Sequence, residues 1–171
     1  TGLTVTEPGR RLARVYGVHD LLAAEAVRSG ILDDCPPGAL AAVLSSLVYE
    51  ARGGGHREPI RLPDRATERA MEEMRRLWRE IRLTERDHRL EQQPPLDIGF
   101  TRAAHAWAEG EDLGEILEET DLAAGDFVRW IRQIIDVAGQ IADASRGRPL
   151  AGRARDLARS MRRGVVDFTD E

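Results

Sequence analysis

The stretch Asp126–Ala144, DFVRWIRQIIDVAGQIADA, decides the fold because its apolar residues recur with the period of an α-helix. At about 100° per residue, the apolar and small side chains cover roughly half of the helix circumference. They are Phe127, Trp130, Ile131, Ile134, Ile135, Val137, Ala138, Ile141 and Ala142. The polar side chains fall in one narrow stripe made of Arg129, Arg132, Gln133, Asp136, Gln140 and Asp143. Because unpaired polar groups are costly in a core, this stripe must face a charged partner, a wet cavity or a ligand path.

The same helical period continues through most of the chain and predicts a mainly α fold, a multi-helix bundle. The predicted helices span residues 19–28, 37–52, 64–93, 98–108, 112–119, 126–144 and 150–163. Gly30 is a favourable C-cap for the first helix, and Pro37 suits the first turn of the second. Acids and bases alternate along the long helix 64–93, which predicts i,i+4 ion pairs on a solvated face. Residues 165–168 are expected to form an extended tail.

The beginning of the chain has a different pattern. Two β-compatible runs, residues 1–5 and 12–16, flank the turn residues Glu7-Pro8-Gly9-Arg10 and predict a β-hairpin within residues 1–17. Two short strands do not form a stable sheet alone. We therefore expect the hairpin to be the remnant of another domain, and the chain to be an excised fragment.

The composition limits the class of protein. A chain of 171 residues can form one domain with its own core. The single cysteine, Cys35, fits a reducing compartment, so we expect a cytoplasmic protein. No apolar run approaches the ~20 residues that span a bilayer, so no membrane partner is expected. The net charge of −5 argues against a protein that clamps nucleic acid over its whole surface.

Charge is nevertheless distributed unevenly along the chain. Residues 109–126 contain eight acids and no base, whereas residues 146–163 contain seven arginines and the single acid Asp156. The basic segment can pair with the acidic one or contact phosphate groups, and the sequence leaves both interpretations open.

The sequence predicts neither a catalytic site nor a metal site in this chain. Gly53-Gly54-Gly55 cannot be a phosphate-binding loop of the P-loop type, because that loop needs a lysine and all 25 basic residues are arginine. The histidines have no cysteine, histidine or carboxylate at metal-site spacing. These scattered residues are His19, His56, His88 and His105. Cys35 is interpreted as a packing residue.

Two groups of short motifs keep the order and spacing of a known domain. The first group contains LTVTEPGR at 3–10, DLL at 20–22 and LAAVLSSLVYE at 40–50. The second contains HAWAEG at 105–110, IL at 116–117, TDL at 120–122, GDFVR at 125–129 and RRGVV at 162–166. Together they resemble the C-terminal DSHCT domain of superfamily 2 DExH-box RNA helicases, and the actinobacterial HelY type is most similar.

The resemblance implies a domain organisation. Residues 18–171 would form the DSHCT helical bundle, which packs against two RecA-like motor domains. The hairpin at 1–17 would be the end of an upstream winged-helix domain. ATP and magnesium bind the motor domains in this family, so this chain by itself would hold no cofactor and have no ATPase activity.

The resemblance also implies a role for the polar stripe. In this family one long helix, often called the ratchet helix, crosses the channel through which single-stranded RNA passes, and residues 126–144 correspond to it. The matching RNA-contacting positions are Arg129, Gln133 and Asp136. Arg132 and Trp130, within and beside the stripe, complete the predicted RNA-binding set. Two alternatives stay open: Trp130 is an ordinary core aromatic, or Arg129 pairs with Asp126 or Asp136.

The sequence also bears on two other classes of function. The chain could be a helical protein-interaction scaffold, with residues 109–121 or the arginine-rich tail as its docking face. A helix-turn-helix over residues 113–133 is disfavoured, because a recognition helix exposes a broad polar face and this helix is mostly apolar.

Overall fold

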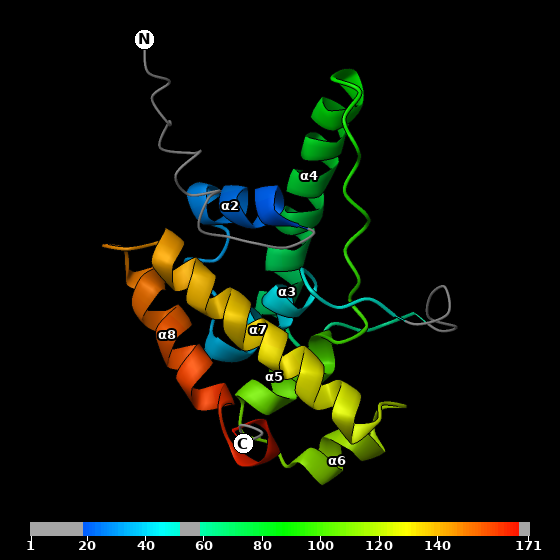
Figure 1. The fold of residues 1–171 in the computed structure, drawn as a ribbon, viewed down its shortest axis with the longest axis vertical. Helices are drawn as coiled ribbons and strands as arrows, with labels where there is room; N and C mark the ends of the chain where they lie inside the picture. Colours follow the sequence, from blue (N-terminus) through cyan, green and yellow to red (C-terminus); the bar gives the residue numbers. More distant parts are fainter. Residues whose placement is uncertain (1–18, 52–58, 168–171) are drawn as a thin grey trace.

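Seven α-helices and one short 3-10 helix form the part of the chain that the computed structural model describes, residues 19–51 and 59–167 (Figure 1). The helices are α2 (Asp20–Ser29), α3 (Pro37–Ser45), α4 (Arg65–Asp87), α5 (Thr101–Ala108), α6 (Leu113–Glu118), α7 (Ala124–Ala144), α8 (Pro149–Met161) and η1 (Gly164–Val166). The mainly α prediction is therefore confirmed, and no strand occurs within these ranges. The predicted hairpin at 1–17 lies outside the described residues.

Side-chain caps begin α4 and α6, and a glycine ends α2. The Asp64 carboxylate accepts a hydrogen bond of 2.7 Å from the Thr67 amide and caps α4. Asp112 caps α6 in the same way through the Gly114 amide. Gly30 ends α2 with a φ of 80°, in the left-handed region that favours glycine.

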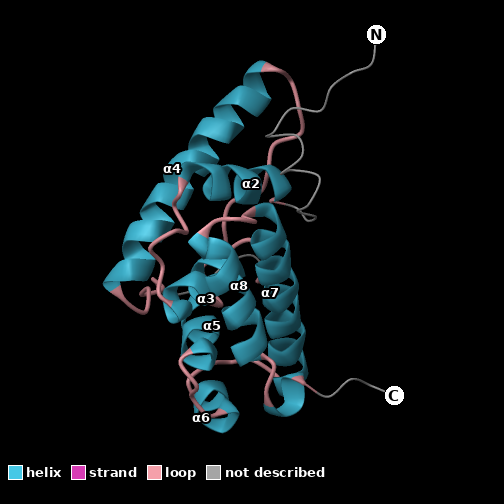
Figure 2. Cartoon of the chain, turned by 90° about the vertical axis from the view of Figure 1, so that its left-hand side faces the viewer, coloured by secondary structure: helices cyan, strands magenta, loops and turns pink. Residues whose placement is uncertain are grey.

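Helix α7 forms one side of the core. It lies alongside α8 and also packs on α3 and α2 (Figures 1 and 2). Helix α3 is short and buried over its length from Gly38 to Ser45, because α4, α5, α7 and α8 all pack on it. Gly38 allows α5 to come close: a Cβ atom there would lie 2.7 Å from His105 Nε2 and 2.6 Å from Glu109 Oε1.

Helix α4 is the longest element; its side chains contribute to the core as far as Ile81, and only its last turns extend from the bundle. Ala70, Met71 and Met74 pack into the core. The second half carries the irregular segment 88–97 back along its side, held by a hydrogen bond of 2.9 Å from Trp78 Nε1 to the Pro94 carbonyl. Figure 1 shows this arm extending from the bundle.

Several predicted boundaries were wrong. Helix α3 ends at Ser45 instead of residue 52, where the hydroxyls of Ser45 and Ser46 each donate a hydrogen bond of 2.7 Å to a carbonyl three residues earlier. Helix α4 ends at Asp87 instead of residue 93, because the chain reverses at Arg89 with a φ of 55°. Residues 164–166 form η1 instead of an extended tail.

The long helix also lacks its predicted i,i+4 ion pairs. Within the described residues, the only ion pair between side chains of α4 joins the neighbours Arg86 and Asp87, at 3.4 Å. None of the helices in those ranges is long and apolar enough to cross a bilayer.

Candidate functional site

The polar stripe of α7 lies at the surface of the described part of the chain. Arg129, Arg132, Asp136 and Asp143 are exposed, and Gln133 and Gln140 are half-buried. The rest of the helix packs inward through ten buried side chains, which are Phe127, Trp130, Ile131, Ile134, Ile135, Val137, Ala138, Ile141, Ala142 and Ala144. The stripe is therefore the part of α7 that is available to a ligand.

A groove with a volume of about 520 Å³ runs along part of this stripe. Its α7 side consists of Val137 and of a row of three polar residues, Gln133, Asp136 and Gln140. These residues are spaced i, i+3 and i+7, so they lie in one row about 10 Å long. The opposite side comes from two segments that follow helices, residues 47–51 after α3 and residues 94–97 after α4, with His19 at the start of α2.

The walls of the groove carry negative charge. Its acids are Glu50, Asp97 and Asp136, and His19 is its only basic side chain among the described residues. Burial lowers the pKa of His19 below its ordinary 6.5, although the hydrogen bond to Gln93 and the negative charges of Glu50 and Glu85 oppose this. A neutral His19 adds no positive charge to this acidic wall, so the groove favours hydrogen-bonding groups over phosphates.

Asp97 has a structural task in this wall. Its two carboxylate oxygens accept hydrogen bonds of 2.8 Å from the amides of Ala51 and Gly99. One side chain thus ties the segment after α3 to the segment that leads into α5. In contrast, Gln133 and Asp136 make no side-chain hydrogen bond or ion pair to any residue in the described ranges.

Arg129 lies outside the residues that line the groove. Its Nη2 is 3.4 Å from Asp126 Oδ1, and its guanidinium carbon lies 4.5 Å from the centre of the Trp130 ring. The ion pair with Asp126 is one of the two alternatives raised by the sequence. Both contacts are local to α7 and partly exposed, so the arginine can exchange them for another anion.

Trp130 belongs to the aromatic core. Its side chain is 9 % exposed, and the ring lies edge-on to Tyr49 at a centroid distance of 5.1 Å. Arg129 lies over the ring. The structure therefore favours the packing interpretation of Trp130 over base stacking.

Arg132 is directed to the C-terminal end of the chain. Its Nε donates a hydrogen bond of 3.4 Å to the Val166 carbonyl in η1, and the side chain does not line the groove. The five predicted residues thus separate into a pair at the groove, Gln133 and Asp136, and three that do not line it, Arg129, Trp130 and Arg132.

Sequence reasoning missed the facing wall. Tyr49 and Glu50 belong to the stretch LAAVLSSLVYE, which pointed to a family but not to a binding surface. Pro94 and Pro95 were interpreted only as helix breakers, yet they line the groove. The available signal was the combination of a family motif with helix-breaking residues, which predicts an irregular segment of the kind that often carries binding groups.

Other reactive groups do not form a site in the described residues. No group of three histidine, cysteine or acidic side chains there could hold a metal ion. Burial raises the pKa of the Cys35 thiol to about 11, and its Sγ lies 3.7 Å from the Ile31 carbonyl oxygen. This cysteine is a packing residue and a poor nucleophile.

Comparison with known proteins supplies the family. The model of the DSHCT (NUC185) domain matches residues 2–169. The probable helicase HelY of Mycobacterium tuberculosis is 38 % identical over 176 residues, which cover 97 % of this chain and 19 % of that protein. The HelY protein of Mycobacterium leprae is 37 % identical over 95 % of this chain and 19 % of its own length.

A more distant relative is eukaryotic. The ATP-dependent RNA helicase mtr4 of Schizosaccharomyces pombe is 24 % identical over 81 % of this chain and 12 % of its own length. The chain thus spans about a fifth or less of the curated relatives that it matches. Because the family model covers nearly its whole length, the chain belongs to the DSHCT (NUC185) domain family and corresponds to one domain of these helicases.

Proposed function

We propose that this chain is the C-terminal accessory domain of an ATP-dependent RNA helicase, where it packs against the RecA-like motor and lines the channel for single-stranded RNA with α7. The relatives support the first part, since HelY is named a probable helicase and mtr4 an ATP-dependent RNA helicase. ATP and magnesium would be held by the motor domains, outside this chain. The winged-helix domain would precede it, with residues 1–17 as its last part.

The observation that carries the channel role is the row of Gln133, Asp136 and Gln140 along one wall of the groove. Gln133 and Asp136 have no side-chain partner in the described residues, so their amide and carboxylate groups are available to a ligand. Amide and carboxylate groups can form hydrogen bonds with base edges and the 2′-hydroxyl of RNA, which all nucleotides present in some form. Such contacts tolerate any sequence, as a translocating strand requires.

The charge of the site supports different RNA groups at the groove and at Arg129. The acidic groove repels phosphates, whereas Arg129 lies just outside it with an exchangeable ion pair to Asp126. A strand could therefore present its bases to the groove and a phosphate to Arg129. The motor would supply the remaining walls of the channel.

The test uses the full-length helicase with the substitutions Arg129→Ala and Gln133→Ala together. We expect slower RNA unwinding and weaker RNA crosslinking to α7, with unchanged thermal stability. The control variant carries Arg155→Ala and Glu118→Ala, which remove one base and one acid from exposed positions of α8 and α6.

Unchanged unwinding and crosslinking in the α7 variant would exclude the channel role. A helical protein-interaction scaffold, the alternative from the sequence, would instead show salt-sensitive binding to a partner protein that the α7 substitutions weaken.

A further inference from the structure

Over residues 72–87 of α4, the arginines gather on one side of the helix. These five bases, Arg75, Arg76, Arg79, Arg82 and Arg86, fall within an arc of about 120° at 100° per residue, and Glu72 lies within the same arc. The acids Glu73, Glu80 and Asp87 recur every seven residues and form a separate line. We call the five arginines the α4 basic face.

The α4 basic face has little compensating charge. Its one ion pair within the described residues joins Arg86 to Asp87 at 3.4 Å, and both side chains are more than 60 % exposed. Arg82 Nε donates a hydrogen bond of 3.1 Å to the neutral amide of Gln92. Arg75, Arg76 and Arg79 form no ion pair with an acid of the described ranges. Glu72, at the inner end of the face, is one of the acids with which they do not pair.

The arginines of the C-terminal segment behave differently. Arg146 pairs with Asp143 at 3.0 Å, Arg148 with Asp33 at 2.6 Å, and Arg159 with Asp156 at 3.2 Å. Arg163 donates hydrogen bonds to the carbonyls of Trp107 and Glu111. Four of the seven arginines in the C-terminal segment thus have a partner within the domain, whereas three of the five on the α4 basic face have no acidic partner in the described ranges.

The surroundings of the α4 basic face suit an extended polyanion. The guanidinium carbon of Arg82 lies 4.8 Å from the centre of the Trp78 ring, so an aromatic side chain borders the arginines. Leu83 is 51 % exposed among the arginines. The face lies on α4, whose last turns extend from the bundle (Figure 1).

We propose that the α4 basic face binds the phosphodiester backbone of single-stranded RNA outside the channel. Arg75, Arg79, Arg82 and Arg86 follow one another at about 6, 4.5 and 6 Å along the helix axis, so a repeating polyanion meets a repeating row of charges. Guanidinium groups bind phosphates through paired hydrogen bonds. The proposal rests on the proposed function only in taking RNA as the nucleic acid.

The test measures binding of the 171-residue chain to a fluorescent polyuridine strand over a range of salt concentrations. The test variant is Arg75→Gln, Arg76→Gln, Arg79→Gln and Arg86→Gln, since glutamine has nearly the helix propensity of arginine. The matched control removes the same charge elsewhere, with Arg146→Gln, Arg155→Gln, Arg159→Gln and Arg162→Gln. Circular dichroism checks that both variants keep their helix content.

We expect the α4 variant to bind about tenfold more weakly at low salt, and its slope of log K against log salt to fall by about 0.7 for each phosphate that the variant no longer neutralises. The control should stay within about threefold of the parent chain. Removing the acids instead, with Glu73→Gln, Glu80→Gln and Asp87→Asn, should strengthen binding. Equal losses of affinity in the α4 variant and the control would overturn the proposal.

Two further outcomes separate this proposal from its alternatives. If polyglutamate displaces the RNA as well as unlabelled polyuridine does, the surface binds acidic proteins and the proposal is wrong. If the α4 variant binds RNA as the parent chain does while the α7 variant of the helicase unwinds RNA more slowly, only the present proposal is wrong. If the α4 variant loses affinity while the α7 variant unwinds and crosslinks RNA normally, only the channel role is wrong.

Discussion

Tyr49 lies edge-on against Trp130, with ring centroids 5.1 Å apart and ring planes at 70°. Tyr49 also stacks on Phe100 at 5.5 Å, and Phe100 contacts Phe127 of α7 at 5.7 Å. Because Tyr49 lines the groove, this aromatic cluster connects the facing wall to the core beneath α7. The width of the groove therefore depends on core packing.

We predict that Trp130→Ala lowers the free energy of unfolding by about 3–5 kcal/mol, because it leaves a cavity and removes the contact with Tyr49. Trp130→Phe keeps a ring and should cost less than half of that. Urea denaturation followed by circular dichroism measures both. In the full-length helicase, Trp130→Phe should retain RNA crosslinking. Loss of crosslinking with unchanged stability would show that the indole stacks on a base.

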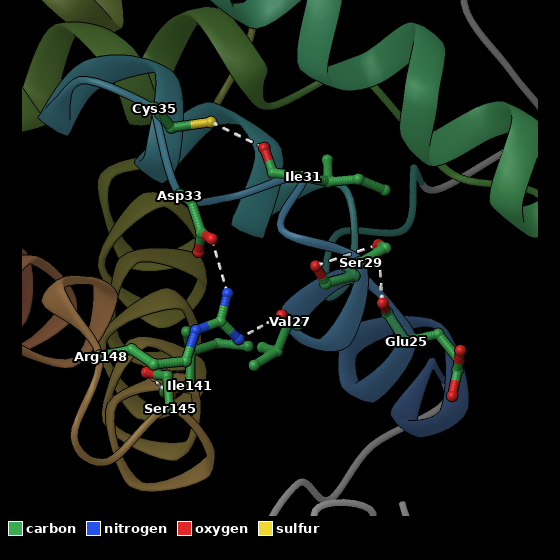
Figure 3. A network of polar contacts seen from close by, with 10 residues as sticks. Glu25, Val27, Ser29, Ile31, Asp33, Cys35, Ile141, Ser145 and Arg148 are labelled. Atoms are coloured by element: carbon green, nitrogen blue, oxygen red, sulfur yellow. Dashed lines mark hydrogen bonds and ion pairs between the residues drawn. The ribbon is translucent and has the colours of Figure 1, made fainter.

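Arg148 connects α8 to the turn after α2 (Figure 3). Its Nη1 donates a hydrogen bond of 2.6 Å to the Val27 carbonyl, and its Nη2 donates one of 2.6 Å to Asp33 Oδ2. We predict that Arg148→Gln lowers the free energy of unfolding by about 1.5–3 kcal/mol, the range for hydrogen bonds to charged groups. Arg148→Lys should recover part of the lost free energy of unfolding, since lysine keeps the positive charge but lacks the two NH2 groups with which the guanidinium binds two acceptors.

The control for Arg148 is Arg146→Gln. Arg146 pairs with Asp143 at 3.0 Å, but both side chains are more than half exposed. This substitution should therefore cost less than about 1 kcal/mol. Equal losses of stability at the two positions in urea denaturation would contradict a specific role for Arg148.

The starts of α3 and α4 could be predicted from sequence because their signals are local. Asp64 and Pro37 act within one turn of the helices that they begin. The end of α4 could not be predicted. It depends on a hydrogen bond of 3.0 Å that the Gln93 amide donates to the Glu85 carboxylate after the chain has reversed its direction. The end of α3 likewise depended on serine hydroxyls, which compete with the helical pattern.

One side of the groove could be predicted from the sequence. The helical period placed Gln133 and Asp136 in the polar stripe, because the exposed side of an amphipathic helix follows from its sequence, and the family resemblance selected them from it. It could not show that residues 47–51 and 94–97 face them, since those contacts join segments far apart in the chain. For the same reason, the period did not separate Arg132, which contacts Val166, from its neighbour Gln133.

Protonation of His19, in the wall of the groove, should make the stability of the domain depend on pH. This residue is 7 % exposed, with Nδ1 3.3 Å from Gln93 Oε1, and burial lowers its pKa below 6.5. The unfolded chain then binds more protons than the folded chain as the pH falls below 6.5. We expect the free energy of unfolding to be constant above this value and to decrease through the lower pKa of the folded state.

His19→Gln should remove this decrease between about pH 7 and 5, as measured by urea denaturation at a series of pH values. The control is His88→Gln, an exposed histidine at the end of α4, which should keep the decrease. Asp64 does not interfere: although burial raises its pKa, hydrogen bonds from Thr67 and His105 lower it below 3.8, so its contribution is lost only at more acidic pH. If the pH dependence of the parent chain and of His19→Gln were the same, the protonation of His19 would not be the cause.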